Sequence, residues 1–325
     1  MQYSLTFASV LALAGSVVAA PGQMTKRAQT VYLAGDSTMA KSPNAPIEGW
    51  GVYAQQFLSL PVVNKAIGGR SSRSYTDEGR FADIISVVQP NDIVVIEFGH
   101  NDGGGLRPGT TDNGRAVCGG DGDETCTSTY NGKQVVVHTF PWYLTQAGKA
   151  LIAKGAKVVI SSQTPNNPWE SGNFVYTDGG RFVTYAKAVA QALGSNAMYV
   201  DHGAYAASAW SSLGKAGTNE RFPVDHTHTN AKGAEVVAQS FFKGVTAQLG
   251  YKYGNDGQVC SSMITHGQAF HFVQYTTNGL NFLPGSTVYT KASTNIPVWG
   301  DGVPIWWQSS DAEVLAKVPV MTPAI

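Results

Sequence analysis

The chain has 325 residues, of which 43% are hydrophobic and 14% are charged, and its 22 basic and 22 acidic side chains leave no formal net charge. A chain of this length and apolar content is not of the disordered class and can bury the core of one or two domains. The charge balance, without any block of Lys or Arg, argues against nucleic acid or an anionic membrane as a partner and favours neutral or weakly charged soluble substrates.

Residues 1–20 have the layout of a secretory signal peptide, with a short polar start, an apolar run over 5–18 and small residues at the end. The start of this segment lacks Lys or Arg, and a buried N-terminal helix is the alternative. The apolar run is too short for a comfortable membrane span, and no other segment is long and apolar enough for one. Residues 21–27 form a short pro-segment that ends in a dibasic pair. We therefore expect a secreted mature chain that begins near Ala28.

Beyond the leader, strand-like apolar runs alternate with amphipathic stretches, which is typical of a parallel sheet covered on both faces. The expected strands are 30–34, 62–66, 92–98, 157–161 and 197–201, and the expected helices are 51–60, 140–154, 180–193 and 230–249. This pattern predicts one doubly wound α/β domain over about residues 28–251. Ligands bind at the carboxyl ends of the strands in such a sheet, so functional residues should directly follow the strands.

The residues at these positions suit acyl transfer. Ser37 follows the first strand, but a serine becomes a nucleophile only when a base takes its proton and an acid orients that base. His228 could be the base and Asp225 the acid. The backbone N–H groups of Ser37 and Gly69 and the side-chain amide of Asn101 are candidate donors to the oxyanion that acyl transfer creates.

Each residue also has a purely structural interpretation. Ser37 or Asp225 could be a helix N-cap, and Gly69 could serve only a tight turn. Another possibility is that His226 and His228 form a His-x-His metal site with Asp225 and His100. No second acidic cluster accompanies these residues, so we expect neither a metal nor another cofactor.

Five blocks of sequence, in this order, resemble the SGNH (GDSL-like) hydrolases and, more narrowly, the secreted fungal rhamnogalacturonan acetylesterases. The blocks are YLAGDSTMA at 32–40, GRS at 69–71, EFGHNDGG at 97–104, SSQTPNNPWE at 161–170 and FPVDHTHT at 222–229. The resemblance runs from about residue 30 to about residue 250. It implies a flavodoxin-like three-layer α/β/α fold with a five-stranded parallel sheet.

The resemblance also implies a function, which is the metal-free removal of acetyl groups from rhamnogalacturonan, a pectic polysaccharide, by a secreted monomer. Ser37 would be the nucleophile, His228 the base and Asp225 the acid, with Ser37, Gly69 and Asn101 as the oxyanion hole. Two alternatives stay open. The protein could be an acetylesterase acting on another polysaccharide or a lipid-like ester, or a carbohydrate-binding protein without catalytic activity.

Candidate substrate contacts follow from the chemistry of a pectic sugar. Trp169 and Asn166 could line a sugar subsite, because aromatic faces and amide donors suit carbohydrate, although they could equally pack the loop. A pectic substrate is acidic, while the chain as a whole is neutral. Only local cations could meet its carboxylates, and Arg70 or Arg73 beside the oxyanion loop could do so.

The three cysteines fit a secreted protein incompletely. Cys118 and Cys126 lie in a loop-like stretch where a disulfide can close a small ring, and they match a loop disulfide that the resemblance implies. Cys260 is left over, and it is free, paired between chains or a sign of an unusual C-terminal sequence. Residues 252–325 extend past the resemblance and hold many aromatic residues, few charges and no helical period. They could be a carbohydrate-binding extension, a loosely ordered tail or a mistranslated segment.

Overall fold

The computed structural model describes residues 27–248, apart from 45, 59, 105, 107–110 and 178, together with the backbone of 251–253 and 259–261. Its centre is a parallel sheet with the strand order β2-β1-β3-β6-β7. The strands are β1 (Val31–Gly35), β2 (Val62–Asn64), β3 (Ile93–Glu97), β6 (Lys157–Ser161) and β7 (Ala197–Val200). The five-stranded parallel sheet expected from the sequence is confirmed. Strand β2 is added on one side of β1, and β3, β6 and β7 follow on the other side. The topological switch point therefore lies between β1 and β3, where α/β sheets open a crevice for ligands.

The central strands are apolar on both faces. In β1, Val31 and Leu33 pack on one side of the sheet, while Tyr32 and Ala34 pack on the other. Residues of β3 alternate in the same way. Because side chains alternate along a strand, a run that is apolar throughout requires cover on both faces.

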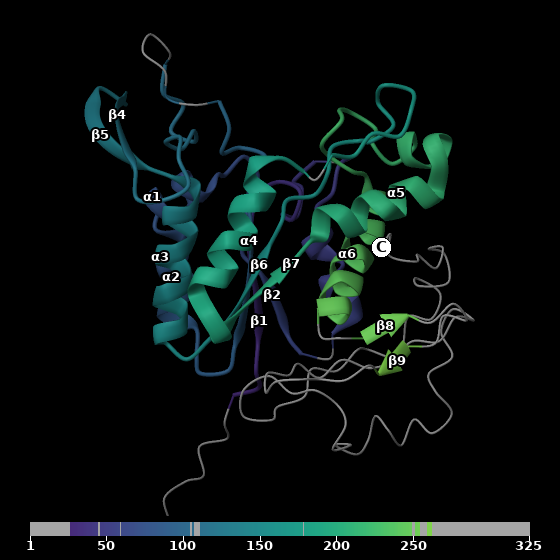
Figure 1. The fold of residues 1–325 in the computed structure, drawn as a ribbon, viewed down its shortest axis with the longest axis horizontal. Coiled ribbons are helices and arrows are strands. Elements are labelled where there is room, and N and C mark those ends of the chain that lie inside the picture. Colours follow the sequence, from purple (N-terminus) through teal and green to yellow (C-terminus); the bar gives the residue numbers. More distant parts are fainter. Residues whose placement is uncertain are drawn as a thin grey trace, which may run out of the picture.

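Helices supply that cover and make three layers (Figure 1). On one face lie α1 (Ser72–Asp77), α2 (Arg80–Val87), α3 (Phe140–Ala153) and α4 (Arg181–Leu193), followed by the 3₁₀ turn η3 (Gly194–Asn196). On the other lie α5 (His202–Asn219) and α6 (Ala231–Gln248), with the 3₁₀ turns η1 (Trp50–Val52) and η2 (Ala54–Phe57). This arrangement confirms the expected α/β/α fold.

The helix expected over 51–60 is wrong, because this stretch forms only η1 and η2. The N–H groups of Trp50 and Gly51 bond to the carbonyls of Thr38 and Met39 in the turn after β1. The start of the segment is therefore held by another part of the chain. Such contacts between distant residues do not appear in a local apolar pattern.

A hairpin that the sequence analysis did not identify stands outside the main sheet. It consists of β4 (Thr125–Tyr130) and β5 (Lys133–His138), paired antiparallel. Asn131 and Gly132 join the strands with φ of 50° and 74°, and left-handed φ at both central positions is the signature of a type I′ turn. The Asn-Gly pair and the run of three valines in β5 were the available signals.

Several predictions fall wholly or partly outside the described residues: the signal peptide, nearly all of the pro-segment, most of 252–325 and the side chain of Cys260. Two short strands, β8 (Tyr251–Tyr253) and β9 (Val259–Ser261), pair antiparallel in this part of the chain. Within the described residues, no helix has the length and apolar character to cross a membrane.

Candidate active site

Three residues from opposite ends of the domain meet where β1 ends and the loop before α6 passes over it. Nε2 of His228 lies 2.8 Å from Oγ of Ser37, and Nδ1 of His228 lies 2.8 Å from Oδ2 of Asp225. An imidazole that donates from Nδ1 to a carboxylate leaves Nε2 as an acceptor for a hydroxyl proton. The arrangement can therefore draw the proton from Ser37.

The acid and the base lie in one tight turn. Oδ1 of Asp225 accepts hydrogen bonds from the N–H groups of Thr227 and His228, both at 2.8 Å. Burial acts to raise the pKa of Asp225, but the hydrogen bonds from the His228 side chain and from these two N–H groups outweigh it and lower that pKa. The group stays a carboxylate, which can stabilise an imidazolium beside it.

Asp36 shapes the turn that carries Ser37. Its Oδ1 accepts hydrogen bonds from the N–H and the hydroxyl of Thr38, at 2.9 and 2.8 Å. The side chain is buried, and burial raises the pKa of Asp36, partly offset by the nearby His100. Its contacts are with the turn and not with the Ser37 hydroxyl, so Asp36 positions the serine.

The three candidate oxyanion donors lie on neighbouring loops. Within the described part of the chain, the backbone N–H groups of Ser37 and Gly69 have no acceptor. Gly69 has a φ of 74°, which favours glycine, and a Cβ built on Gly68 would lie 3.7 Å from Cβ of Ser37. Nδ2 of Asn101 donates to the carbonyl of Arg70 at 3.1 Å and has a second hydrogen to offer.

Asp102 ties the two donor loops together. Its Oδ1 accepts hydrogen bonds from the N–H and the hydroxyl of Ser72, at 2.9 and 2.5 Å, at the start of α1. Burial raises the pKa of Asp102 to about 7, against hydrogen bonds from Ser72 that lower it. Its Oδ2 is buried without a partner among the described residues. The loop of Gly69 and the loop of Asn101 are therefore joined through one side chain.

A buried polar network lies beneath these loops, and the sequence analysis did not find it. Glu97, at the end of β3, accepts hydrogen bonds from Nε1 of Trp50 at 2.8 Å, from Oγ of Ser161 at 2.5 Å and from Nδ1 of His202 at 2.7 Å. Nε2 of His202 lies 2.9 Å from the carbonyl of Val237. His202 therefore bridges the carboxylate of Glu97 and the backbone of α6.

The proposed sugar contacts lie on the loop beside His228. Trp169 is half-buried, its Nε1 donates to the carbonyl of Trp210 at 3.0 Å and its ring meets Phe174 edge to face. These are contacts of a packed loop. Asn166 is exposed, and its Oδ1 accepts from the hydroxyl of Thr227 at 2.9 Å. Asn166 is therefore the more open of the two to a ligand.

The two arginines expected to meet substrate carboxylates both have acidic partners. Arg73 is 1% exposed and forms a two-point ion pair with Asp112, so the expectation that it faces the substrate is wrong. The Nε of Arg70 donates to both oxygens of Glu78, at 3.0 and 3.1 Å. The sequence analysis missed a third arginine, Arg115, whose Nη1 lies 3.3 Å from Oδ1 of Asn101.

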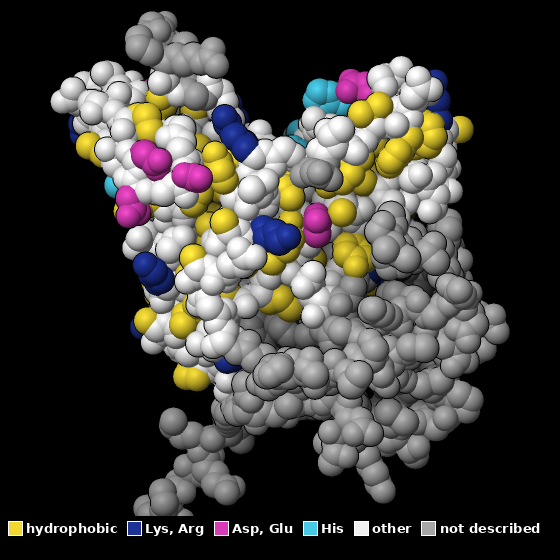
Figure 2. Space-filling model, in the orientation of Figure 1, with side chains coloured by type: hydrophobic (Ala, Val, Ile, Leu, Met, Phe, Trp, Pro, Cys, Tyr) yellow, Lys and Arg dark blue, Asp and Glu magenta, His cyan; other side chains and the backbone are white. Residues whose placement is uncertain are grey.

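Figure 2 shows a hollow at the upper edge of the molecule, between the lobe that carries β4 and β5 and the lobe that carries α5. Lys and Arg side chains lie on one wall and His side chains on the opposite rim.

His226, which is exposed, contacts Glu170 at 3.1 Å. Among the described residues, no group of three or more His, Cys, Asp or Glu side chains could hold a metal.

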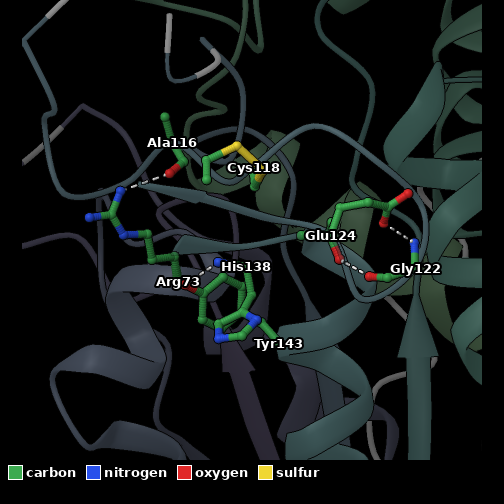
Figure 3. The surroundings of a disulfide bond; sticks show 9 residues. Arg73, Ala116, Cys118, Gly122, Glu124, His138 and Tyr143 are labelled. Atoms are coloured by element: carbon green, nitrogen blue, oxygen red, sulfur yellow. Dashed lines mark hydrogen bonds between the residues drawn. A yellow bond between two sulfur atoms is a disulfide. The ribbon is translucent and has the colours of Figure 1, made fainter. Parts of the chain in front are cut away.

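Cys118 and Cys126 form a disulfide with a Cα–Cα distance of 5.4 Å, the pairing that the resemblance implied (Figure 3). The bond connects the loop that follows Asn101 to strand β4. The N–H of Cys118 also bonds to the carbonyl of His138 on β5 at 2.9 Å. The hairpin thus stabilises the loop that follows Asn101, one of the candidate oxyanion donors.

Comparisons with known proteins identify related sequences and a related fold. The rhamnogalacturonan acetylesterase of Emericella nidulans is 57% identical over 218 residues, which cover 67% of this chain and 85% of that protein. The probable rhamnogalacturonan acetylesterase YesY of Bacillus subtilis is 28% identical over 227 residues, covering 67% of this chain and 93% of that protein. The crystal structure of Bacillus subtilis YxiM, at 19% identity, has the same fold, with a TM-score of 0.53 over 68% of this chain and 57% of that one. The model of the GDSL-like lipase/acylhydrolase family matches residues 33–236, and the chain belongs to that family.

Proposed function

We propose that this ester hydrolase removes acetyl groups from rhamnogalacturonan, with Ser37 as its nucleophile. The observation that carries the proposal is the unbroken chain of contacts from Asp225 through His228 to Ser37, at 2.8 Å each. The identity of 57% to a rhamnogalacturonan acetylesterase supports the choice of substrate.

In the first half of the reaction, Oγ of Ser37 forms a bond to the acetyl carbon while its proton passes to Nε2 of His228. The negative charge on the carbonyl oxygen is met by the N–H groups of Ser37 and Gly69 and by the amide of Asn101. Each such donor typically contributes a few kcal/mol to the transition state. The bond between the acetyl carbon and the sugar oxygen then breaks. The sugar oxygen takes the proton from His228, and the acetyl group remains on Ser37.

In the second half, His228 takes a proton from a water molecule, whose oxygen bonds to the acetyl carbon. The same donors hold the second oxyanion. The bond to Oγ of Ser37 breaks, the serine regains its proton from His228 and acetate leaves. Asp225 keeps the ring oriented and stabilises its charge in both halves.

We also propose that the enzyme works outside the cell. The leader pattern over residues 1–20 and the disulfide between Cys118 and Cys126 support this, because disulfides persist in oxidising compartments. N-terminal sequencing of the protein recovered from the culture medium of an expressing host tests the proposal. A mature start near Ala28 is the expected result, and retention of the leader in intracellular protein would contradict it.

The central test compares Ser37→Ala with Ser86→Ala, a control on the exposed side of α2. Acetate release is measured from acetylated rhamnogalacturonan, xylan and homogalacturonan. We expect wild type and the control to prefer rhamnogalacturonan, and Ser37→Ala to lose activity on all substrates at an unchanged circular dichroism spectrum. Full activity of Ser37→Ala would contradict the mechanism. A preference for xylan would contradict the substrate.

A further inference from the structure

Arg115 places an exposed cation beside two of the candidate oxyanion donors. Its Nη1 lies 3.3 Å from Oδ1 of Asn101. The same nitrogen would lie 3.9 Å from a Cβ built on Gly69. The guanidinium therefore lies near both donors, although its backbone is 14 residues past Asn101 in the loop between β3 and β4.

The charge of Arg115 has no carboxylate partner within ion-pair distance among the described residues. This separates it from Arg70 and Arg73, whose guanidinium groups are bound to Glu78 and Asp112. A guanidinium has five N–H donors, and the bond to Asn101 uses one of them. Since the side chain is exposed, its other donors are open to a ligand.

The backbone around Arg115 is held from within its own loop. Oδ1 of Asn113 accepts hydrogen bonds from the N–H groups of Arg115 and Ala116, at 2.9 and 3.1 Å. Gly114 has a φ of 73°, and a Cβ there would lie 2.5 Å from the ring of Tyr130 on β4. A side chain at this position would therefore be strained and would displace Tyr130.

The ends of the loop are anchored as well. The buried pair between Asp112 and Arg73 holds one side, and Arg73 also donates to the carbonyl of Ala116 (Figure 3). On the other side, the N–H of Val117 bonds to the carbonyl of Asp102, and the disulfide follows at Cys118. Arg115 therefore projects from a fixed base, so that binding a ligand orders little more than one side chain.

We propose that Arg115 binds the carboxylate of a uronic acid residue next to the acetylated sugar, and so selects acidic polysaccharides. The proposal rests on the proposed function, because the substrate must bring both an acetyl ester and a carboxylate. The planar guanidinium matches a carboxylate with two parallel hydrogen bonds, which a lysine cannot do. Its place beside the oxyanion donors sets the carboxylate close to the ester that reacts.

The experiment uses Arg115→Gln, Arg115→Lys and the control Lys149→Gln, which removes an exposed charge from the distal half of α3. Kinetics are measured on 4-nitrophenyl acetate, on acetylated rhamnogalacturonan oligosaccharides and on the same oligosaccharides with methyl-esterified carboxylates. For Arg115→Gln, we expect kcat/KM on the acidic oligosaccharides to fall about 10- to 100-fold, mainly through KM, as loss of a charge-assisted hydrogen bond predicts. Activity on the other two substrates should stay within about threefold, as it should for Lys149→Gln on all three. Arg115→Lys should fall between wild type and Arg115→Gln on the acidic oligosaccharides.

An equal loss on 4-nitrophenyl acetate would overturn the proposal, since it would mean that Arg115 acts only through Asn101. No loss on the acidic oligosaccharides would overturn it too. A separate measurement is the inhibition of 4-nitrophenyl acetate hydrolysis by unacetylated, galacturonate-containing oligosaccharides, which should weaken about tenfold or more in Arg115→Gln. If this inhibition is seen in wild type and weakens in Arg115→Gln, but wild type releases no acetate from rhamnogalacturonan, the proposed function fails while the role of Arg115 stands. Equal inhibition of both proteins, or none of wild type, overturns the role itself.

Discussion

Removing the Glu97 carboxylate should be among the most destabilising single changes in the domain. Glu97 is 1% exposed and His202 is fully buried, so Glu97→Ala leaves Nδ1 of His202 in the core without its partner. Leaving a buried polar group without its hydrogen-bond partner costs about 1–3 kcal/mol. Nε1 of Trp50 also loses its acceptor, for about 1–3 kcal/mol more. Ser161 adds little, because its hydroxyl has a second acceptor in the carbonyl of Ser162.

The expected loss for Glu97→Ala is therefore about 2–6 kcal/mol in the free energy of unfolding, a large part of the roughly 5–15 kcal/mol that holds a typical domain together. Glu97→Gln keeps the side-chain volume and one acceptor oxygen for Trp50. Nδ1 of His202 can then accept from the new amide while Nε2 donates to the carbonyl of Val237. We expect this variant to lose only about 1–3 kcal/mol.

Urea unfolding followed by circular dichroism at pH 7 measures both variants against wild type. A loss below about 1 kcal/mol for Glu97→Ala would refute the reasoning, as would equal losses for the two variants. If Glu97→Ala does not fold, the Gln variant still decides the matter. A loss above about 4 kcal/mol for that variant would mean that an amide cannot replace the carboxylate in this network.

Three further predictions concern the loops of the site. The folded-state pKa of Asp102 is about 7 against an ordinary 3.8, so the folded protein holds that proton longer and stability should fall by on the order of 4 kcal/mol as pH rises from about 4 to 7. Asp102→Asn should flatten this decline in urea titrations at several pH values, and an unchanged slope would count against it. Replacing Cys118 and Cys126 together by Ala should cost about 2–3 kcal/mol, since the bond closes a short loop, and wild type under reducing conditions should show the same loss. Gly99→Ala should cost about 1–3 kcal/mol and lower kcat, because φ is 147° and the new Cβ would strike the side chain of Gln163; wild-type kcat and stability would contradict this.

Much of the fold could be predicted from sequence because its signals are local. Each of the five strands is an apolar run, and the helices α3, α4 and α6 have apolar residues at helical spacing. Other elements lack that signal. Helix α1 is six residues long and buries Arg73, a residue type that normally marks a surface. Helix α5 contains a non-helical residue, Gly214, with a φ of 70°. In the hairpin, β4 is mostly polar, and the sequence signals were the Asn-Gly turn and the three valines of β5, residues 135–137.

The candidate triad was predictable for a different reason. Ser37, Asp225 and His228 lie in sequence blocks of a known order, so no distance had to be known in advance. The arginines had no such block. Arg70 and Arg73 are near the oxyanion glycine in sequence, yet carboxylates elsewhere in the fold neutralise both. Arg115 lies 46 positions after Gly69 in the sequence. Its guanidinium comes near Gly69 because its loop folds back and is held by the disulfide to the hairpin.

The candidate site consists of two parts that can move relative to each other: the turn that contains Asp225 and His228, and the turn that carries Ser37. Acid and base belong to one backbone turn of four residues, closed by hydrogen bonds within itself, so their separation does not depend on how the sheet and α6 are packed. The distance from His228 to Ser37 does depend on that packing, because Ser37 lies in the turn that follows β1. Heat, denaturant or a distant core mutation should therefore separate the base from the nucleophile first. A loosened enzyme would keep a correctly oriented histidine that no longer reaches its serine.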